Sequence, residues 1–179
     1  MASLGRFLPQ RQEIRCVFGT VVFAVYSWAV RGFLYQLPAL RIYYQLGDIL
    51  MTLLYVMAFA LVESLLVTGI LLLVSAVLPE RWFRDGFAYK GFILILVTSI
   101  TMIALQGMLG DFMPWLETLY RLFGIAAIAL ITLIFVFHSF PRLQNFLLLV
   151  EERLQIFLYV YIPLGVMGAL IVLIRNLWR

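Results

Sequence analysis

The sequence predicts an all-α integral membrane protein: a polytopic helical bundle of about five transmembrane helices, with one interfacial amphipathic helix before the last span. Hydrophobic residues make up 65% of the 179-residue chain and charged residues only 12%, whereas soluble domains are about half apolar and about one quarter charged. Residues 49–78 form a run with a single charged side chain, Glu63, near its midpoint. About 20 apolar residues suffice to cross a bilayer core as a helix.

The apolar stretches, and the prolines and glycines between them, set the expected boundaries. Residues 1–15 are expected to form a cytoplasmic segment and residues 16–179 a single transmembrane domain. Leu37-Pro38 is expected to end the first span, because the residue before a proline avoids the helical region. Asp48 is expected to cap the second span. The five predicted spans cover about residues 16–37, 48–78, 91–109, 115–137 and 154–174.

Residues 142–153, between the fourth and fifth spans, have the pattern of an amphipathic helix. Four apolar side chains fall on one face at helical spacing: Leu143, Phe146, Leu147 and Val150. Polar side chains fall mostly on the opposite face: Arg142, Asn145, Glu152 and Arg153. This pattern is typical of a helix that lies in the membrane interface.

The basic residues predict the orientation of the chain. With the N-terminus inside, the inner side holds eight of them: Arg6, Arg11, Arg15, Arg81, Arg84, Lys90, Arg142 and Arg153. The outer side then holds five, a modest bias in the direction of the positive-inside rule. We therefore expect an integral protein of a bacterial inner membrane with a cytoplasmic N-terminus. The net charge of +4 is spread over helix ends, without the basic tracts that bind nucleic acid.

Glu63 is the strongest candidate for a functional residue, because a charged group at the bilayer centre costs about 2.5 kcal/mol or more. It lies 15 residues before Leu78, and Gln106 lies 15 residues after Gly91. At 1.5 Å per residue, both lie about 22 Å from the inner boundary. Gln106 is therefore the predicted partner of Glu63 within the chain. A hydrogen bond that locks helices together is favoured, and a proton or ion site and a lipid or ligand contact are the alternatives.

Small residues beside Glu63 predict close helix packing. Ala60, Ser64 and Thr68 follow one another at four-residue spacing, and Gly165, Gly168 and Ala169 form a similar group in the last span. Small side chains let helix backbones approach one another closely. Ser64 and Thr68 therefore join Glu63 and Gln106 as the predicted intramembrane polar and packing residues.

Other chemistry has little support in the sequence. His138 is the only histidine; a role as a single axial ligand to haem or chlorophyll is the weak candidate, and a position at a helix end is favoured. No nucleophile elbow, zinc-protease motif or P-loop is present. We therefore predict no catalytic, metal-binding or cofactor-binding residues, and any cofactor remains unknown.

These features favour a non-enzymatic integral membrane subunit or scaffold that packs with partner helices in a larger membrane complex. Its partners would be membrane lipids together with other membrane protein subunits or further copies of itself, and not nucleic acid. The alternative is a small oligomeric channel or transporter in which Glu63 is a mid-membrane polar site. An enzyme acting on lipids has the least support.

Overall fold

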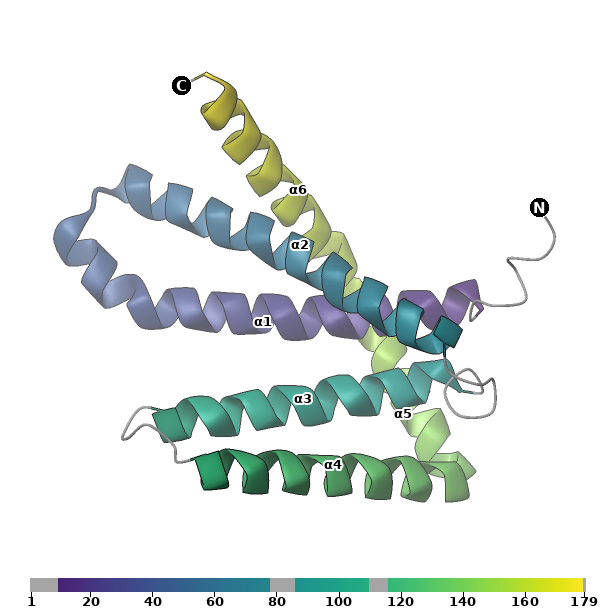
Figure 1. The fold of residues 1–179 in the computed structure, drawn as a ribbon. Helices are drawn as coiled ribbons and strands as arrows, with labels where there is room; N and C mark the ends of the chain where they lie inside the picture. Colours follow the sequence, from purple (N-terminus) through teal and green to yellow (C-terminus); the bar gives the residue numbers. More distant parts are fainter. Residues whose placement is uncertain (1–9, 78–85, 110–115, 179) are drawn as a thin grey trace.

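The computed structural model describes residues 10–77, 86–109 and 116–178, and this part of the chain is helical without strands (Figure 1). This confirms the predicted all-α fold class. Predicted features that fall on residues 1–9, 78–85 and 110–115 lie outside the described residues; these include the end of the second span at Leu78 and the start of the fourth at Trp115. The helices are α1 (Arg11–Tyr43), α2 (Leu46–Val77), α3 (Phe87–Leu109), α4 (Leu116–Ser139), α5 (Pro141–Leu154) and α6 (Ile156–Leu177).

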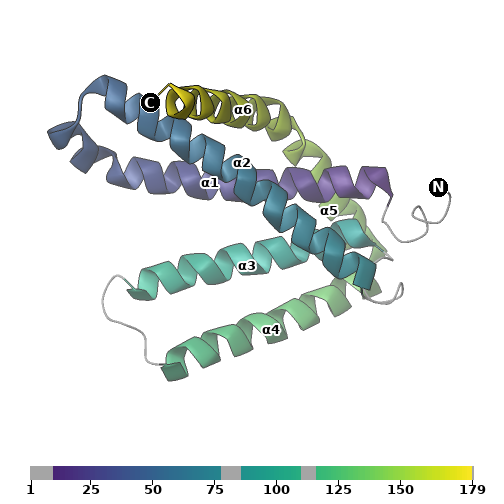
Figure 2. The same ribbon diagram turned by 45° about the horizontal axis from the view of Figure 1, so that its top comes forward.

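Five stretches are long and apolar enough to cross a membrane, as predicted. They are Arg11–Tyr43, Leu46–Val77, Phe87–Gly107, Glu117–Ser139 and Arg142–Leu177. The last stretch contains both α5 and α6. The 14 residues of α5 extend about 21 Å, which is shorter than a bilayer core of about 30 Å. Figures 1 and 2 show α5 crossing the ends of α1, α3 and α4, so we assign the crossing to α6.

Three predicted boundaries are wrong. The first helix does not end at Leu37 but continues through Pro38 to Tyr43, and it bends near this end (Figure 1), as helices do around an internal proline. The second begins at Leu46, so Asp48 is not its cap: the N–H groups of Asp48 and Ile49 both donate to the Gln45 carbonyl.

The third correction concerns α3, which begins one turn before Gly91, at Phe87. Gly86 adopts a φ of 74°, a left-handed conformation that glycine accepts without strain, and its carbonyl accepts a hydrogen bond from the Lys90 N–H. Phe87 and Tyr89 are buried in the clusters that join α3 to its neighbours. Burial of these aromatic side chains explains why the helix includes a turn that the sequence pattern assigned to a polar loop.

Helix α1 is the central element of the bundle. It packs against α2, α3, α5 and α6, while α4 contacts α3 and α5 (Figures 1 and 2). One buried cluster joins α1 to α2 and α3 through Val17, Val21, Leu71, Phe87 and Ile95. A second cluster joins α1 to α2 through Val22, Tyr26, Met57 and Ala60, with residues of α6 packed against it. The chain thus forms two helix pairs, α2–α6 and α3–α4, on either side of α1.

The small residues of α2 and α6 lie at these contacts. Ala60, Ser64 and Thr68 are all buried, and each hydroxyl donates to a carbonyl of its own helix, Ser64 to Ala60 at 2.6 Å and Thr68 to Ser64 at 2.8 Å. These side chains therefore provide a smooth surface for close packing and need no partner on a neighbouring helix. On α6, Gly165 and Gly168 are buried against the backbone of α2.

We predict that Gly168→Ala weakens the packing of α6 on α2. A Cβ at Gly168 would lie 2.5 Å from the Leu54 carbonyl oxygen of α2, so the two backbones would have to separate, and such overpacking costs roughly 1–3 kcal/mol. The free energy of unfolding in mixed detergent–SDS micelles measures this loss. Gly69→Ala is the matched control, because a Cβ there meets nothing within 4 Å. Equal stability of the two variants would contradict close packing at Gly168.

Candidate functional site

Glu63 lies near the middle of α2 on a surface that no other part of the described chain covers. Its side chain is exposed, and it shares one face of the helix with Phe59, Leu66 and Ile70, which are each at least half exposed. We call these four residues the Glu63 face. Among the described residues Glu63 has no hydrogen bond and no ion pair. The structure therefore places a carboxyl group at mid-helix, on a face that would contact lipid in an isolated chain.

The structure does not bring Glu63 and Gln106 together. Helix α2 packs on α1 and α6, whereas α3 packs on α1, α4 and α5. The predicted depth match assumed that α3 begins at Gly91; because it begins at Phe87, Gln106 lies 19 residues from the start and three from the end. Gln106 is thus near the outer end of its helix, with an exposed side chain. The predicted pairing within one chain is wrong, because α2 and α3 pack on different neighbours.

The other predicted residues also lie away from the Glu63 face. Ser64 and Thr68 lie on the buried side of α2, so they belong to the packing surface and not to the Glu63 face. His138 is exposed in the last turn of α4, where the Gln144 side chain donates to the adjacent Phe137 carbonyl at 2.8 Å. The described residues contain no group of three or more His, Cys, Asp or Glu side chains that could hold a metal ion.

Glu151 of α5 is the residue that sequence reasoning missed. Its side chain is completely buried, and neither carboxyl oxygen has a hydrogen-bond partner in the part of the chain that the structure describes. The pattern contained a signal for this, since Glu151 follows Leu147 by four residues and Leu143 by eight, which puts it on the apolar face of the amphipathic helix. Leu147 is itself buried against α3 in a cluster with Tyr89, Phe92 and Ile93.

Helix α5, which carries Glu151, packs on α1 and α3. Cys16 of α1 is buried and accepts a hydrogen bond from the Gln155 amide at 3.1 Å. Lys90 at the start of α3 is also buried. Burial, and after it the negative charge of Glu13 on α1, raise the pKa of Glu151 from its ordinary value of 4.5 to about 7. This carboxyl group therefore keeps its proton at pH values where an exposed glutamate has lost it.

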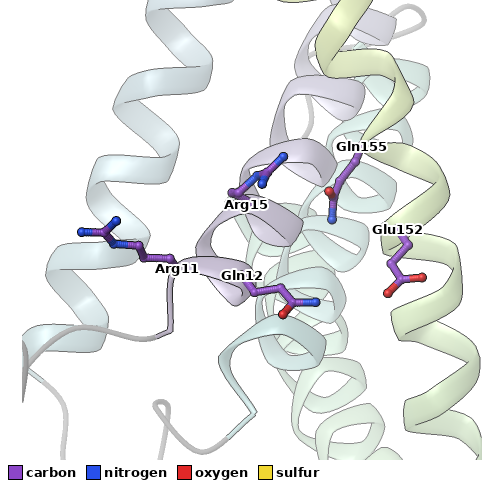
Figure 3. A pocket seen from close by; sticks show the side chains of 5 residues that line it. All are labelled: Arg11, Gln12, Arg15, Glu152 and Gln155. Carbon is purple, nitrogen blue, oxygen red and sulfur yellow. The ribbon is translucent and has the colours of Figure 1, made fainter.

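An open hollow of about 440 Å³ lies beside this junction, lined by Arg11, Gln12, Arg15, Glu152 and Gln155. Figure 3 shows the Arg15 side chain pointing toward Gln155, while Arg11 points away on the other side of α1. The two guanidinium groups therefore do not converge on one point. A single anion could not contact both, and we assign no ligand to this hollow.

We predict that Glu151→Gln stabilises the protein at high pH and has little effect at low pH. Below about pH 4.5 the wild-type carboxyl is neutral whether folded or unfolded, so the substitution changes little. Between about pH 4.5 and 7 the carboxyl ionises in the unfolded chain but not in the folded one, so the wild type loses stability as the pH rises through this window. Above it, from the raised pKa, the variant should be more stable by about 3 kcal/mol relative to wild type. Unfolding in mixed micelles at pH 5 and pH 8 measures this difference.

Glu152→Gln is the matched control, because Glu152 is the adjacent residue and its side chain is exposed. It should change stability little at either pH. A gain of the same size at both pH values for Glu151→Gln would contradict ionisation of a buried carboxyl group as the cause.

Comparison with known proteins gives no match for this chain, whether with protein-family models, with curated proteins or with solved structures.

Proposed function

We propose that this chain is a non-enzymatic integral membrane subunit that packs with partner helices in a larger membrane complex. The observation that carries the proposal is the exposed Glu63 at the middle of α2. Insertion of such a carboxylate at the bilayer centre costs about 2.5–3.5 kcal/mol, and polar residues at this depth usually face protein or water. A partner helix with a hydrogen-bond donor or a cation would remove this penalty.

The exposure of α4 supports the same proposal. In the most apolar 18 residues of α4, no residue is buried. In the most apolar 18 residues of α1 and of α3, 39% of the residues are buried. A shallow apolar hollow on its surface is lined by Ile125, Ile128, Ala129, Thr132 and Leu133. Lipid can cover such a surface, so α4 alone would not require a partner; together with Glu63 it offers a second packing surface for one.

The proposal also includes the identity of the membrane and the orientation of the chain in it. We place the protein in a bacterial inner membrane with its N-terminus in the cytoplasm, on the strength of the Lys and Arg bias described above. In this orientation α5 and the buried Glu151 lie at the cytoplasmic surface.

The alternative function is a small oligomeric channel or transporter. Several copies arranged with α2 around an axis would form a ring of Glu63 carboxyl groups. The other members of the Glu63 face, Phe59, Leu66 and Ile70, are apolar, so such a path would be polar at one level only. This composition favours the subunit over the channel.

Gentle extraction followed by mass measurement tests the proposed function. We expect a particle that exceeds the 20.6 kDa chain with its bound detergent, and Glu63→Leu should reduce the fraction of chain in that particle about tenfold. Glu63→Gln should retain the particle, because an amide still forms hydrogen bonds. A stable wild-type monomer without any co-purifying protein would refute the proposal.

The channel alternative makes a separate prediction. Liposomes that contain the purified chain should pass protons or cations, and Glu63→Gln should reduce this flux because it removes the ionisable group. Flux that is absent, or equal in wild type and variant, would exclude the alternative.

A further inference from the structure

We infer that the partner on the Glu63 face is a second copy of this chain, and that its contact to Glu63 is the guanidinium group of Arg31. The inference rests on the proposed function and specifies the partner. It follows from the position of the charges within the spans, from the exposure of both side chains and from their relative depth.

Arg31 is the counterpart of Glu63 on α1. It lies 20 residues after the start of α1 and 12 before its end, so it is inside the span and not at its tip. Its side chain is exposed and its guanidinium carbon lies 5.6 Å from the ring centre of Trp28, one turn earlier on the same face. Leu34 and Tyr35 are exposed beside it. Arg31 thus occupies an aromatic and apolar surface like that around Glu63.

The two residues stand apart from the other charges in the described spans. Every other charged side chain of α1, α2, α3, α4 and α6 lies within two turns or so of a helix end. Arg31 and Glu63 have opposite charges and occur once each. Two copies can therefore neutralise the deep charges of one another, whereas one copy leaves both exposed to lipid. In the bilayer, an ion pair in which both partners are covered avoids the penalty that each bears alone.

The relative depth of the two residues permits this contact. The helices α1 and α2 form an antiparallel pair joined by Tyr44 and Gln45, with Arg31 12 residues before the end of α1 and Glu63 17 residues after the start of α2. The difference of five residues corresponds to about 7.5 Å when it is measured along the helix axes. An arginine side chain is long enough to cover most of this offset. Copies related by an axis along the normal keep the same depth, so the same offset holds between them.

A contact within one chain does not form. The described residues contain no ion pair between Arg31 and Glu63, and the Glu63 face points away from α6 and from the buried side of α2 that packs on α1. Both charges therefore lie on outward surfaces of the same molecule. The competing arrangement leaves Arg31 extended toward the outer headgroups and Glu63 facing lipid, without a second copy.

Charge reversal in two differently tagged copies tests the contact between chains. Glu63→Arg alone and Arg31→Glu alone each place like charges opposite one another at every contact between identical copies, so each variant should associate with itself at least about tenfold less than wild type. When the two variants are co-expressed, every contact between one variant and the other joins opposite charges again. Co-isolation of one tag with the other should then recover to within about twofold of wild type.

A reversed charge could prevent insertion of the chain into the membrane. A double-mutant cycle of uncharged leucine variants therefore provides a second test. Glu63→Leu and Arg31→Leu should weaken self-association to a similar extent, and the double variant should weaken it no further, since either change removes the same pair. Arg41→Glu is the matched control: Arg41 is exposed in the last turn of α1, and its reversal should leave self-association unchanged. Independent, additive effects of the two leucine variants would overturn the inference.

The outcomes separate this inference from the proposed function. If the tagged wild-type copies do not co-isolate but other membrane proteins do, the second copy is refuted while the role as a subunit stands. If Arg31→Leu leaves self-association unchanged while Glu63→Leu abolishes it, copies meet at Glu63 through another group and the Arg31 contact is refuted. A solitary monomer in the gentle extraction would refute both.

Discussion

Close approach of helix backbones at small residues is the interaction on which this structure depends. Lipid chains are as apolar as leucine, so no hydrophobic force drives one span against another, and association relies on packing and on polar contacts. Glycine is present at several of the closest contacts: Gly91 of α3 against Val17 of α1, and Gly165 and Gly168 of α6 against α2. Gly19 of α1 lies against Gln155, where α5 turns into α6. Side chains at these points would separate the helices from α1 or α2.

The polar side chains of the described spans contribute little to this association. Thr20, Ser64 and Thr68 are buried, yet each hydroxyl donates to a carbonyl one turn earlier in its own helix. Such internal hydrogen bonds satisfy the hydroxyl without linking two helices. The Cys16–Gln155 contact is a side-chain hydrogen bond between helices that the described residues do form, and it lies at the end of the bundle. Shape, and not hydrogen bonding, therefore determines which helices pack together here.

Much of the fold could be predicted from the sequence because its signals are local. Hydrophobic runs give the number of spans, and the spacing of Leu143, Leu147 and Val150 gives the amphipathic α5. The pairing of Glu63 with Gln106 was predicted wrongly, because it depended on one helix end and on which helices pack together. Phe87 and Tyr89 extend α3 by a turn through contacts with other helices, and no local pattern contains those contacts. The spacing puts Glu151 on the apolar face of this helix, but its burial depends on how α5 packs on α1 and α3, which no local pattern contains.

Glu151 and Glu63 have no hydrogen-bond partner among the described residues, and they show how the depth of a carboxyl group in the membrane determines what it requires. Glu151 is buried at the end of the bundle, close to the aqueous boundary, where it can take up a proton from water and remain without a partner. Glu63 lies at mid-span on an outward face, where lipid offers no hydrogen bonds and water is remote. Protonation alone would still leave a hydroxyl and a carbonyl unsatisfied in hydrocarbon. A partner chain can supply the hydrogen bonds that Glu63 lacks within the fold of one chain. Arg31 has the complementary charge and is likewise exposed to lipid in a single copy.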